Sequence, residues 1–166
     1  REVEERLRSS KMSWTILRPM NFMEAWLSPL LGFDPANGKA RILGSGERPV
    51  SWVSIRDVAR FAVAAVDSAR LVGQVLLLGG PDALSYRDVI HIFEEQGAPP
   101  IEVEAVPEAA LEAQLANASN PFEEAYAAIM LATARGLKVD PAPALEILPG
   151  RLCTVREYAK SILGDK

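Results

Sequence analysis

Four side chains of types that often do chemistry stand out in the sequence: Asp57, Ser85, His91 and Cys153. Asp57 lies where an apolar stretch passes into a helical pattern, which suits a catalytic carboxylate or a helix cap, and we favour the cap. Ser85 and His91 belong to one helical segment with Asp88, so they do not form a catalytic triad. Cys153 lies far from His91 and shows no zinc spacing. We therefore assign no catalytic residue and no metal ligand.

The stretch Ser13–Trp26, "SWTILRPMNFMEAW", is the strongest indication of a binding site. The apolar run Trp14–Leu17 is typical of a strand covered on both faces, and Pro19 is expected to end it. In open α/β sheets, ligands bind just beyond the carboxyl ends of strands. The apolar cluster after the strand suits either a binding wall or the core, and consists of Met20, Phe22, Met23 and Trp26.

Phosphate-binding and hydrolase motifs are absent from the sequence. The stretch "LGSGERP" has two glycines but precedes an extended segment, so we interpret it as a turn. No serine lies in a G-x-S-x-G elbow. The chain by itself is therefore expected to bind NAD(P) weakly or not at all.

Composition indicates a globular chain of 166 residues, 49% hydrophobic and 24% charged. A net charge of −4 disfavours nucleic acid as a partner and leaves small molecules or proteins. The longest apolar runs are too short for a membrane span and no signal peptide is recognisable, so a cytoplasmic location is expected. The sequence begins at Arg1 in a helical pattern, which we interpret as a fragment of a longer protein.

Hydrophobic periodicity and capping residues predict an alternation of strands and helices. Strands are expected at Trp14–Leu17, Lys39–Leu43, Val50–Val53, Gln74–Leu78 and Ile101–Val106. Helices are expected at Glu2–Ser9, Phe22–Leu31, Asp57–Arg70, Pro107–Ala118 and Pro121–Arg135, and from the caps Ser85 and Thr154 onward. Ser54 or Asp57 would cap the third helix, and Asp88 and Glu157 would complete capping boxes.

The motifs "VEERLRSSKMSWTILRPMNFME", "VSWVSIRDVARFAVAAV" and "GQVLLLGGPDALSYRDVIHIFEE" occur in this order. Together they resemble the C-terminal half of atypical short-chain dehydrogenase/reductase proteins of the NmrA-like type, over roughly Glu2–Gln96. The resemblance implies an α/β fold: the C-terminal portion of a Rossmann-like NAD(P)-binding fold, with a partial parallel sheet in residues 1–84 and a small α-rich substrate-binding lobe in residues 85–166.

The resemblance also implies roles for the residues after the first strand. Pro19, Met20 and Asn21 would contact the nicotinamide end of NAD(P) in the full-length parent, and Phe22 and Trp26 would line the substrate side. The usual Asn-Val-Tyr-Gly-Pro run of sugar-nucleotide epimerases does not follow Pro19, which argues against a nucleotide-sugar substrate. An apolar wall suits an uncharged or aromatic ligand.

Two classes of function remain open for the parent protein. It is expected to be an NAD(P)-dependent oxidoreductase or epimerase-like enzyme acting on a small molecule. The alternative is a non-enzymatic NAD(P)-binding redox sensor that binds a protein partner. No Tyr-x-x-x-Lys pair is present to decide between them. Because removal of an upstream half would uncover a strand edge, the chain alone is expected to self-associate.

Overall fold

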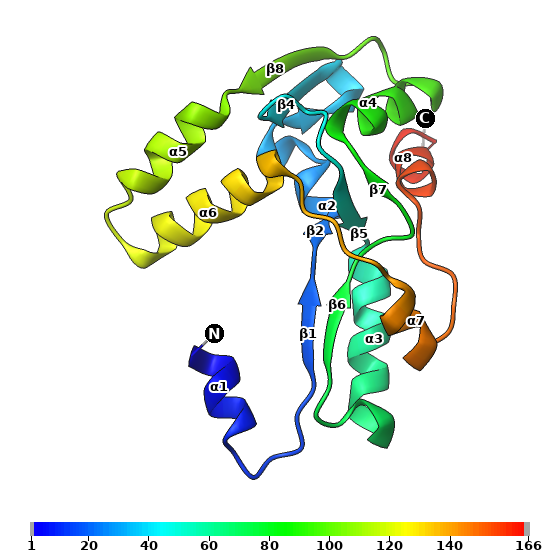
Figure 1. Cartoon of the computed structure of the whole chain (residues 1–166). Coiled ribbons are helices and arrows are strands. Elements are labelled where there is room, and N and C mark those ends of the chain that lie inside the picture. Colours follow the sequence, from blue (N-terminus) through cyan, green and yellow to red (C-terminus); the bar gives the residue numbers. More distant parts are fainter. Residues whose placement is uncertain (1, 165–166) are drawn as a thin grey trace.

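The computed structural model describes residues 2–164 as a mixed α/β chain (Figure 1). Its helices are α1 Glu2–Arg8, α2 Met23–Trp26, α3 Ile55–Asp67, α4 Tyr86–Glu95, α5 Glu108–Ala116, α6 Pro121–Arg135, α7 Ala142–Ile147 and α8 Val155–Leu163. Its strands are β1 Ile16–Pro19, β2 Asn21–Phe22, β3 Phe33–Asp34, β4 Lys39–Leu43, β5 Val50–Val53, β6 Val75–Leu78, β7 Ala83–Leu84 and β8 Glu102–Val106.

The strands form three small sheets. β1 pairs in parallel with β6, and β2 pairs in parallel with β5, whose other neighbour is the antiparallel β7. β4 lies between the antiparallel β3 and the parallel β8. The parallel pairs confirm the expected α/β class, since parallel neighbours require a crossover connection, here supplied by α3 between β1 and β6.

Two hydrophobic clusters hold these layers together. The smaller one lies between β6, α3 and α7 and is built on Phe61, Leu76, Leu78 and Ala144. The larger one joins β4 and β5 to α4, α6 and α8, with Trp52 and Phe93 fully buried in it. The larger cluster therefore contains residues from both sides of position 84.

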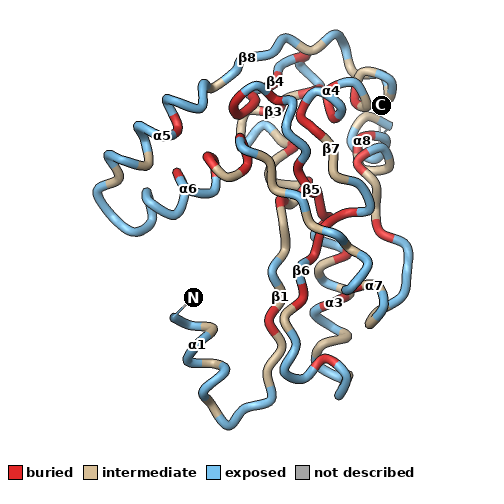
Figure 2. The backbone as a smooth tube through the Cα atoms, in the orientation of Figure 1, coloured by how far each residue is buried: buried red, intermediate tan, exposed pale blue. Residues whose placement is uncertain are grey.

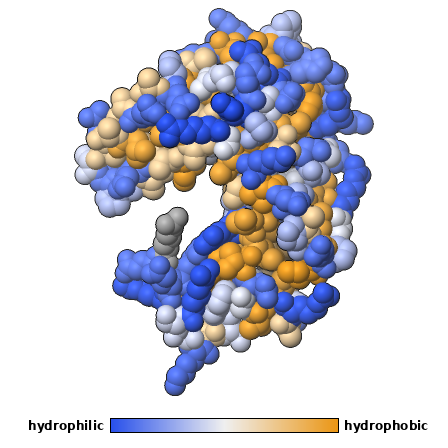
Figure 3. Space-filling model, viewed as in Figure 1, coloured by the Kyte–Doolittle hydropathy of each residue, from blue (hydrophilic) through white to orange (hydrophobic). Residues whose placement is uncertain are grey.

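Helices α5 and α6 form an antiparallel arm that projects from β8 and returns to β5 (Figure 1). The arm is mostly exposed along its length (Figure 2). Ion pairs from Arg135 to Glu108 and Glu112 join its two helices. Below the arm, the molecular surface is hollowed and carries apolar side chains over the central strands (Figure 3).

Local chemistry explains where the expected helices begin. The Ser54 hydroxyl accepts from the Asp57 N–H and caps α3, which resolves the two capping candidates in favour of Ser54. Both expected capping boxes are confirmed, at the starts of α4 and α8. The expected strand at the exposed edge is confirmed as β8, beside β4.

Two expectations around the first strand are wrong. The strand expected at Trp14–Leu17 lies two residues later, at Ile16–Pro19, and Pro19 ends it as expected, opposite Leu78. The N–H groups of Ile16 and Met20 donate to β6, so in a parallel ladder the nitrogen of Pro19 points away from β6 and its missing donor is not needed there.

The helix expected over Phe22–Leu31 is the second error. Asn21 and Phe22 form a strand, and α2 spans a single turn. Pro29 disfavours helical backbone at the preceding residue, and Ser28 is extended, with φ −137° and ψ 162°. The helix predicted at Asp57–Arg70 likewise begins earlier, at Ile55, and ends at Asp67.

Candidate functional site

The carboxyl ends of β1 and β6 lie side by side and define one edge of the candidate site. Half-buried Pro19 ends β1, half-buried Met20 follows it, and the Met20 N–H donates to the Leu78 carbonyl at 2.9 Å. After β6 the chain passes close against β5 at Gly80. A Cβ added there would lie 1.8 Å from the Trp52 carbonyl oxygen, so only glycine permits this approach.

Asn21 connects this edge to the arm. Its side chain is buried, and its Nδ2 donates to the Thr133 hydroxyl of α6 at 3.2 Å. Because both groups are buried, the bond satisfies polar atoms that would otherwise destabilise the contact. The Asn21 amide therefore holds α6 in position above the strand ends.

Trp26 is half-buried and faces an apolar pocket of about 360 Å³ beneath the arm. The pocket is formed by α2, the turn after it, β4, α4 and both helices of the arm, and is lined by Trp26, Pro29, Leu30, Leu31, Gly32, Arg41, Leu43, Tyr86, Val106, Leu111, Gln114, Tyr126 and Met130. Phe22, the other expected substrate residue, is half-buried and is not among the lining residues. The structure thus brings one of the two into a cavity that fits a small aromatic molecule.

Tyr86 contributes the most buried polar group in this pocket. Its side chain is 4% exposed, and its ring packs edge-on against Trp52 at a centroid distance of 5.2 Å. Within residues 2–164 no hydrogen bond joins its hydroxyl to another side chain or to the backbone. Burial raises the pKa of Tyr86, so the hydroxyl stays protonated and is a hydrogen-bond donor for a bound molecule.

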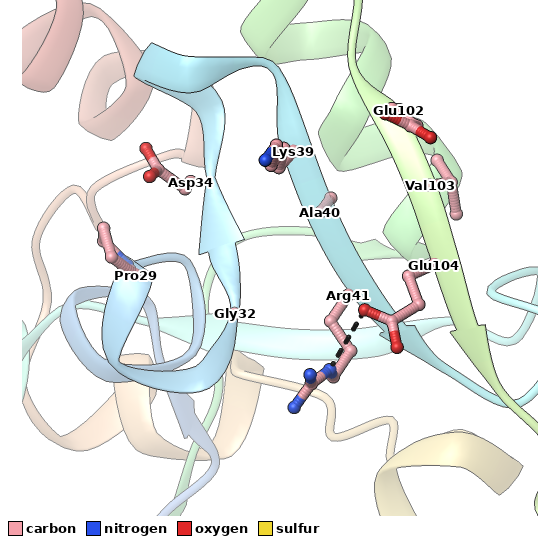
Figure 4. A pocket seen from close by; sticks show the side chains of 9 residues that line it. All are labelled: Pro29, Gly32, Asp34, Lys39, Ala40, Arg41, Glu102, Val103 and Glu104. Carbon is pink, nitrogen blue, oxygen red and sulfur yellow. Dashed lines mark ion pairs between the residues drawn. The ribbon is translucent and has the colours of Figure 1, made fainter.

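A groove of about 540 Å³, with more charged side chains in its lining, adjoins the apolar pocket (Figure 4). The two cavities share Pro29, Gly32 and Arg41 as lining residues. The groove runs over β4 and β8, where Arg41 pairs with Glu104 at 3.6 Å. Arg41 is thus the charged residue placed between the two cavities.

Asp57 and Cys153 lie together at the start of α3, which follows β5. The Asp57 carboxylate is 4% exposed and accepts hydrogen bonds from the Cys153 N–H at 2.8 Å and from the Ser54 hydroxyl at 3.1 Å. Burial and the nearby Glu157, in that order of effect, raise the pKa of the Cys153 thiol. The buried Asp57 carboxylate joins α3 to the segment that precedes α8, and the Cys153 thiol is protonated. We interpret both groups as structural. Among the described residues no cluster of His, Cys, Asp or Glu could hold a metal ion.

Sequence reasoning missed Tyr86, Arg41 and Tyr126 as candidate site residues. Tyr86 belongs to the buried face of a helix, and the only indication in the sequence of a functional role is a phenol at a core position. Arg41 and Tyr126 lie 85 positions apart in the sequence and meet only in the pocket. The turn interpretation of "LGSGERP" is confirmed, since the stretch connects β4 to β5.

The parallel strand pairs and the crossover helix define an α/β protein of the Rossmann-like class. The chain matches the NmrA-like family over residues 1–159, and it belongs to that family. This confirms the family to which the sequence motifs were assigned.

Relatives and solved structures agree with this class. The chain is 33% identical over 152 residues to the (4-alkanoyl-5-oxo-2,5-dihydrofuran-3-yl)methyl phosphate reductase of Streptomyces griseus, covering 91% of this chain and 53% of that protein. Its fold matches the binary complex of leucoanthocyanidin reductase and NADPH from Vitis vinifera, with a TM-score of 0.75, 15% identity, and 99% and 59% of the two chains covered. It also matches the NADPH-dependent quinone oxidoreductase of Escherichia coli complexed with NADPH, with a TM-score of 0.73, 19% identity, and coverage of 97% and 57%.

The chain spans about half the length of the curated relatives it matches. Within residues 2–164 no helix has the length and apolarity needed to cross a bilayer.

Proposed function

We propose that the full-length protein containing this chain is an NAD(P)H-dependent reductase of a small aromatic or conjugated carbonyl compound, and that the apolar pocket beneath the arm holds the substrate. The observation that carries the proposal is the position of this pocket. Trp26 and Tyr86 line it, and Trp26 ends α2, which follows β2, the strand that begins two residues after Pro19. The pocket also includes Leu43 and Val106, the last residues of the parallel strands β4 and β8, and ligands in open α/β folds lie at such carboxyl ends.

The chain's residues fit one end of the cofactor. Pro19 and Met20 provide a half-buried, largely apolar surface at the carboxyl ends of β1 and β6, which suits a nicotinamide ring. Asn21 contributes by holding α6, and with it the pocket wall, against this edge. No glycine-rich strand-turn-helix is present, so the pyrophosphate would be bound by residues outside this chain. When bound, the reduced cofactor supplies hydride.

In this proposal Tyr86 orients the substrate. The protonated Tyr86 phenol lines the pocket and can donate to a carbonyl oxygen of the substrate. Trp26 offers an aromatic face for the ring system. Phe22 does not line the pocket but lies four residues before Trp26, and we assign it to the substrate side as well.

The test is NADPH oxidation by the full-length protein with a panel of quinones and enones. Tyr86→Phe is expected to lower kcat/KM about tenfold, because it removes a buried hydrogen bond of about 1.4 kcal/mol. The matched control is Tyr126→Phe, since Tyr126 lines the same pocket but is 48% exposed. That variant should stay within about twofold of the parent, as solvent replaces an exposed hydrogen bond.

Tight NADPH binding without turnover of any panel member would instead support the redox-sensor alternative. An equal loss for both tyrosine variants would contradict the role proposed for Tyr86.

A further inference from the structure

The lining of the apolar pocket is electrostatically one-sided. The chain is acidic, with 22 Asp and Glu against 18 Lys and Arg. Among the described residues, however, the pocket is lined by one charged side chain, Arg41, and by no carboxylate. Arg41 therefore gives the pocket a positive charge that no carboxylate of its lining offsets.

The Arg41 side chain is free to meet a ligand. Its stem crosses Gly32, where an added Cβ would lie 2.9 Å from the Arg41 Cβ. The absence of a side chain at Gly32 therefore leaves the space that the arginine occupies between the two cavities (Figure 4).

The present partner of Arg41 is weakly held. The Nε of Arg41 lies 3.6 Å from Glu104, and the two side chains are 52% and 73% exposed. Within residues 2–164 its guanidinium makes this ion pair and no hydrogen bond. Exposed ion pairs contribute little, so an incoming oxyanion can replace Glu104 at small cost.

We propose that Arg41 selects the substrate class: the pocket takes a small aromatic molecule that bears one oxyanionic group, a carboxylate or a phosphate, which pairs with the guanidinium where the two cavities adjoin. This inference rests on the proposed function, in which the same pocket holds the substrate. The ring system lies against Trp26, and the oxyanion lies on the pocket side of Arg41, away from the groove carboxylates Asp34, Glu102 and Glu104. Arginine suits this role because its planar fork binds carboxylate and phosphate in a bidentate manner.

The experiment measures equilibrium binding of unreactive probes to the full-length protein with NADP⁺ present, by tryptophan fluorescence. The probes are naphthoate, naphthyl phosphate and the neutral naphthalenemethanol, which share one ring system. The unmodified protein should bind both anions more tightly than the neutral probe. Arg41→Gln should weaken binding of the anions about tenfold and change the neutral probe less than about twofold.

Two further variants separate recognition from a structural role. Glu104→Gln releases Arg41 from its partner and should tighten anion binding by about twofold to threefold at low salt. Lys39→Gln is the matched control, because Lys39 lies two residues away on the same face of β4 and lines the groove but not the pocket. It should leave all three affinities within about twofold, since a distant exposed charge is screened.

The outcomes are distinct. The inference is overturned if Arg41→Gln weakens binding of all three probes equally, or if Lys39→Gln weakens anion binding as much as Arg41→Gln does. Neither result contradicts the proposed substrate pocket. Binding of naphthalenemethanol without any preference for the anions also overturns it. If no probe binds, the proposed substrate pocket fails together with the inference.

Discussion

Replacement of Asp57 tests whether this buried carboxylate is structural or chemical. Its two oxygens contact the Cys153 N–H at 2.8 Å, the Ser54 hydroxyl at 3.1 Å and the Arg60 guanidinium at 3.2 Å. Asp57→Ala removes all three contacts and leaves the Cys153 N–H without its acceptor. Loss of a hydrogen bond to a charged acceptor costs about 1.5–3 kcal/mol, and loss of a carboxylate from the first helical turn costs about 0.3–1 kcal/mol more.

We therefore expect Asp57→Ala to lower the free energy of unfolding by about 3 kcal/mol. Asp57→Asn keeps one acceptor oxygen and the shape of the side chain, so a loss of about 1–1.5 kcal/mol is expected. Urea unfolding of the full-length protein, followed by circular dichroism, measures both values. At temperatures where the variants remain folded, kcat/KM for a quinone should stay near that of the parent.

The matched control is Asp67→Ala. Asp67 is the last residue of the same helix and is exposed, so its replacement should change the unfolding free energy by less than about 0.5 kcal/mol. The structural reasoning is refuted if Asp57→Asn leaves stability unchanged but abolishes turnover, because Asp57 would then take part in the chemistry.

Four further predictions follow from the same contacts. Gly80→Ala should cost about 3 kcal/mol or more in urea unfolding, because the added methyl overlaps the Trp52 carbonyl. Hydrogen bonds from Thr154 lower the pKa of Glu157 in the folded protein, so Glu157→Gln should lower the free energy of unfolding at neutral pH. This difference from the parent protein should disappear as the pH falls from the unfolded value of 4.5 through the lower pKa of the folded state. Phe22→Ala should reduce turnover more than stability; a loss of several kcal/mol with normal kinetics would assign Phe22 to the core. The isolated chain should form dimers or larger species by light scattering, since β1 has one unpaired edge among the described strands; a stable monomer at 18.0 kDa would contradict this.

Local interactions made several features predictable from sequence. The capping boxes at Ser85 and Thr154 depend on residues three positions apart, and the parallel strand β6 appears as a short continuous apolar run. The same motifs, at their spacing, were sufficient to assign the NmrA-like family. Sequence also indicated Trp26 as a wall of a ligand site, and the structure places it in the pocket.

Tertiary structure decided the rest, because the relevant contacts join residues far apart in the chain. β1 can include Pro19 because β6 pairs with the side of the strand away from the proline nitrogen. The sequence alone does not show which side of the strand is paired. Whether Phe22 begins a helix depends on the pairing offered by Val53. By itself, the sequence determined the fold class and the helix caps. The pocket forms only when α4, β4 and the arm pack together, because a cavity is bounded by surfaces from distant parts of the chain that no local sequence pattern encodes. This packing brings Tyr86 and Arg41 into the same lining.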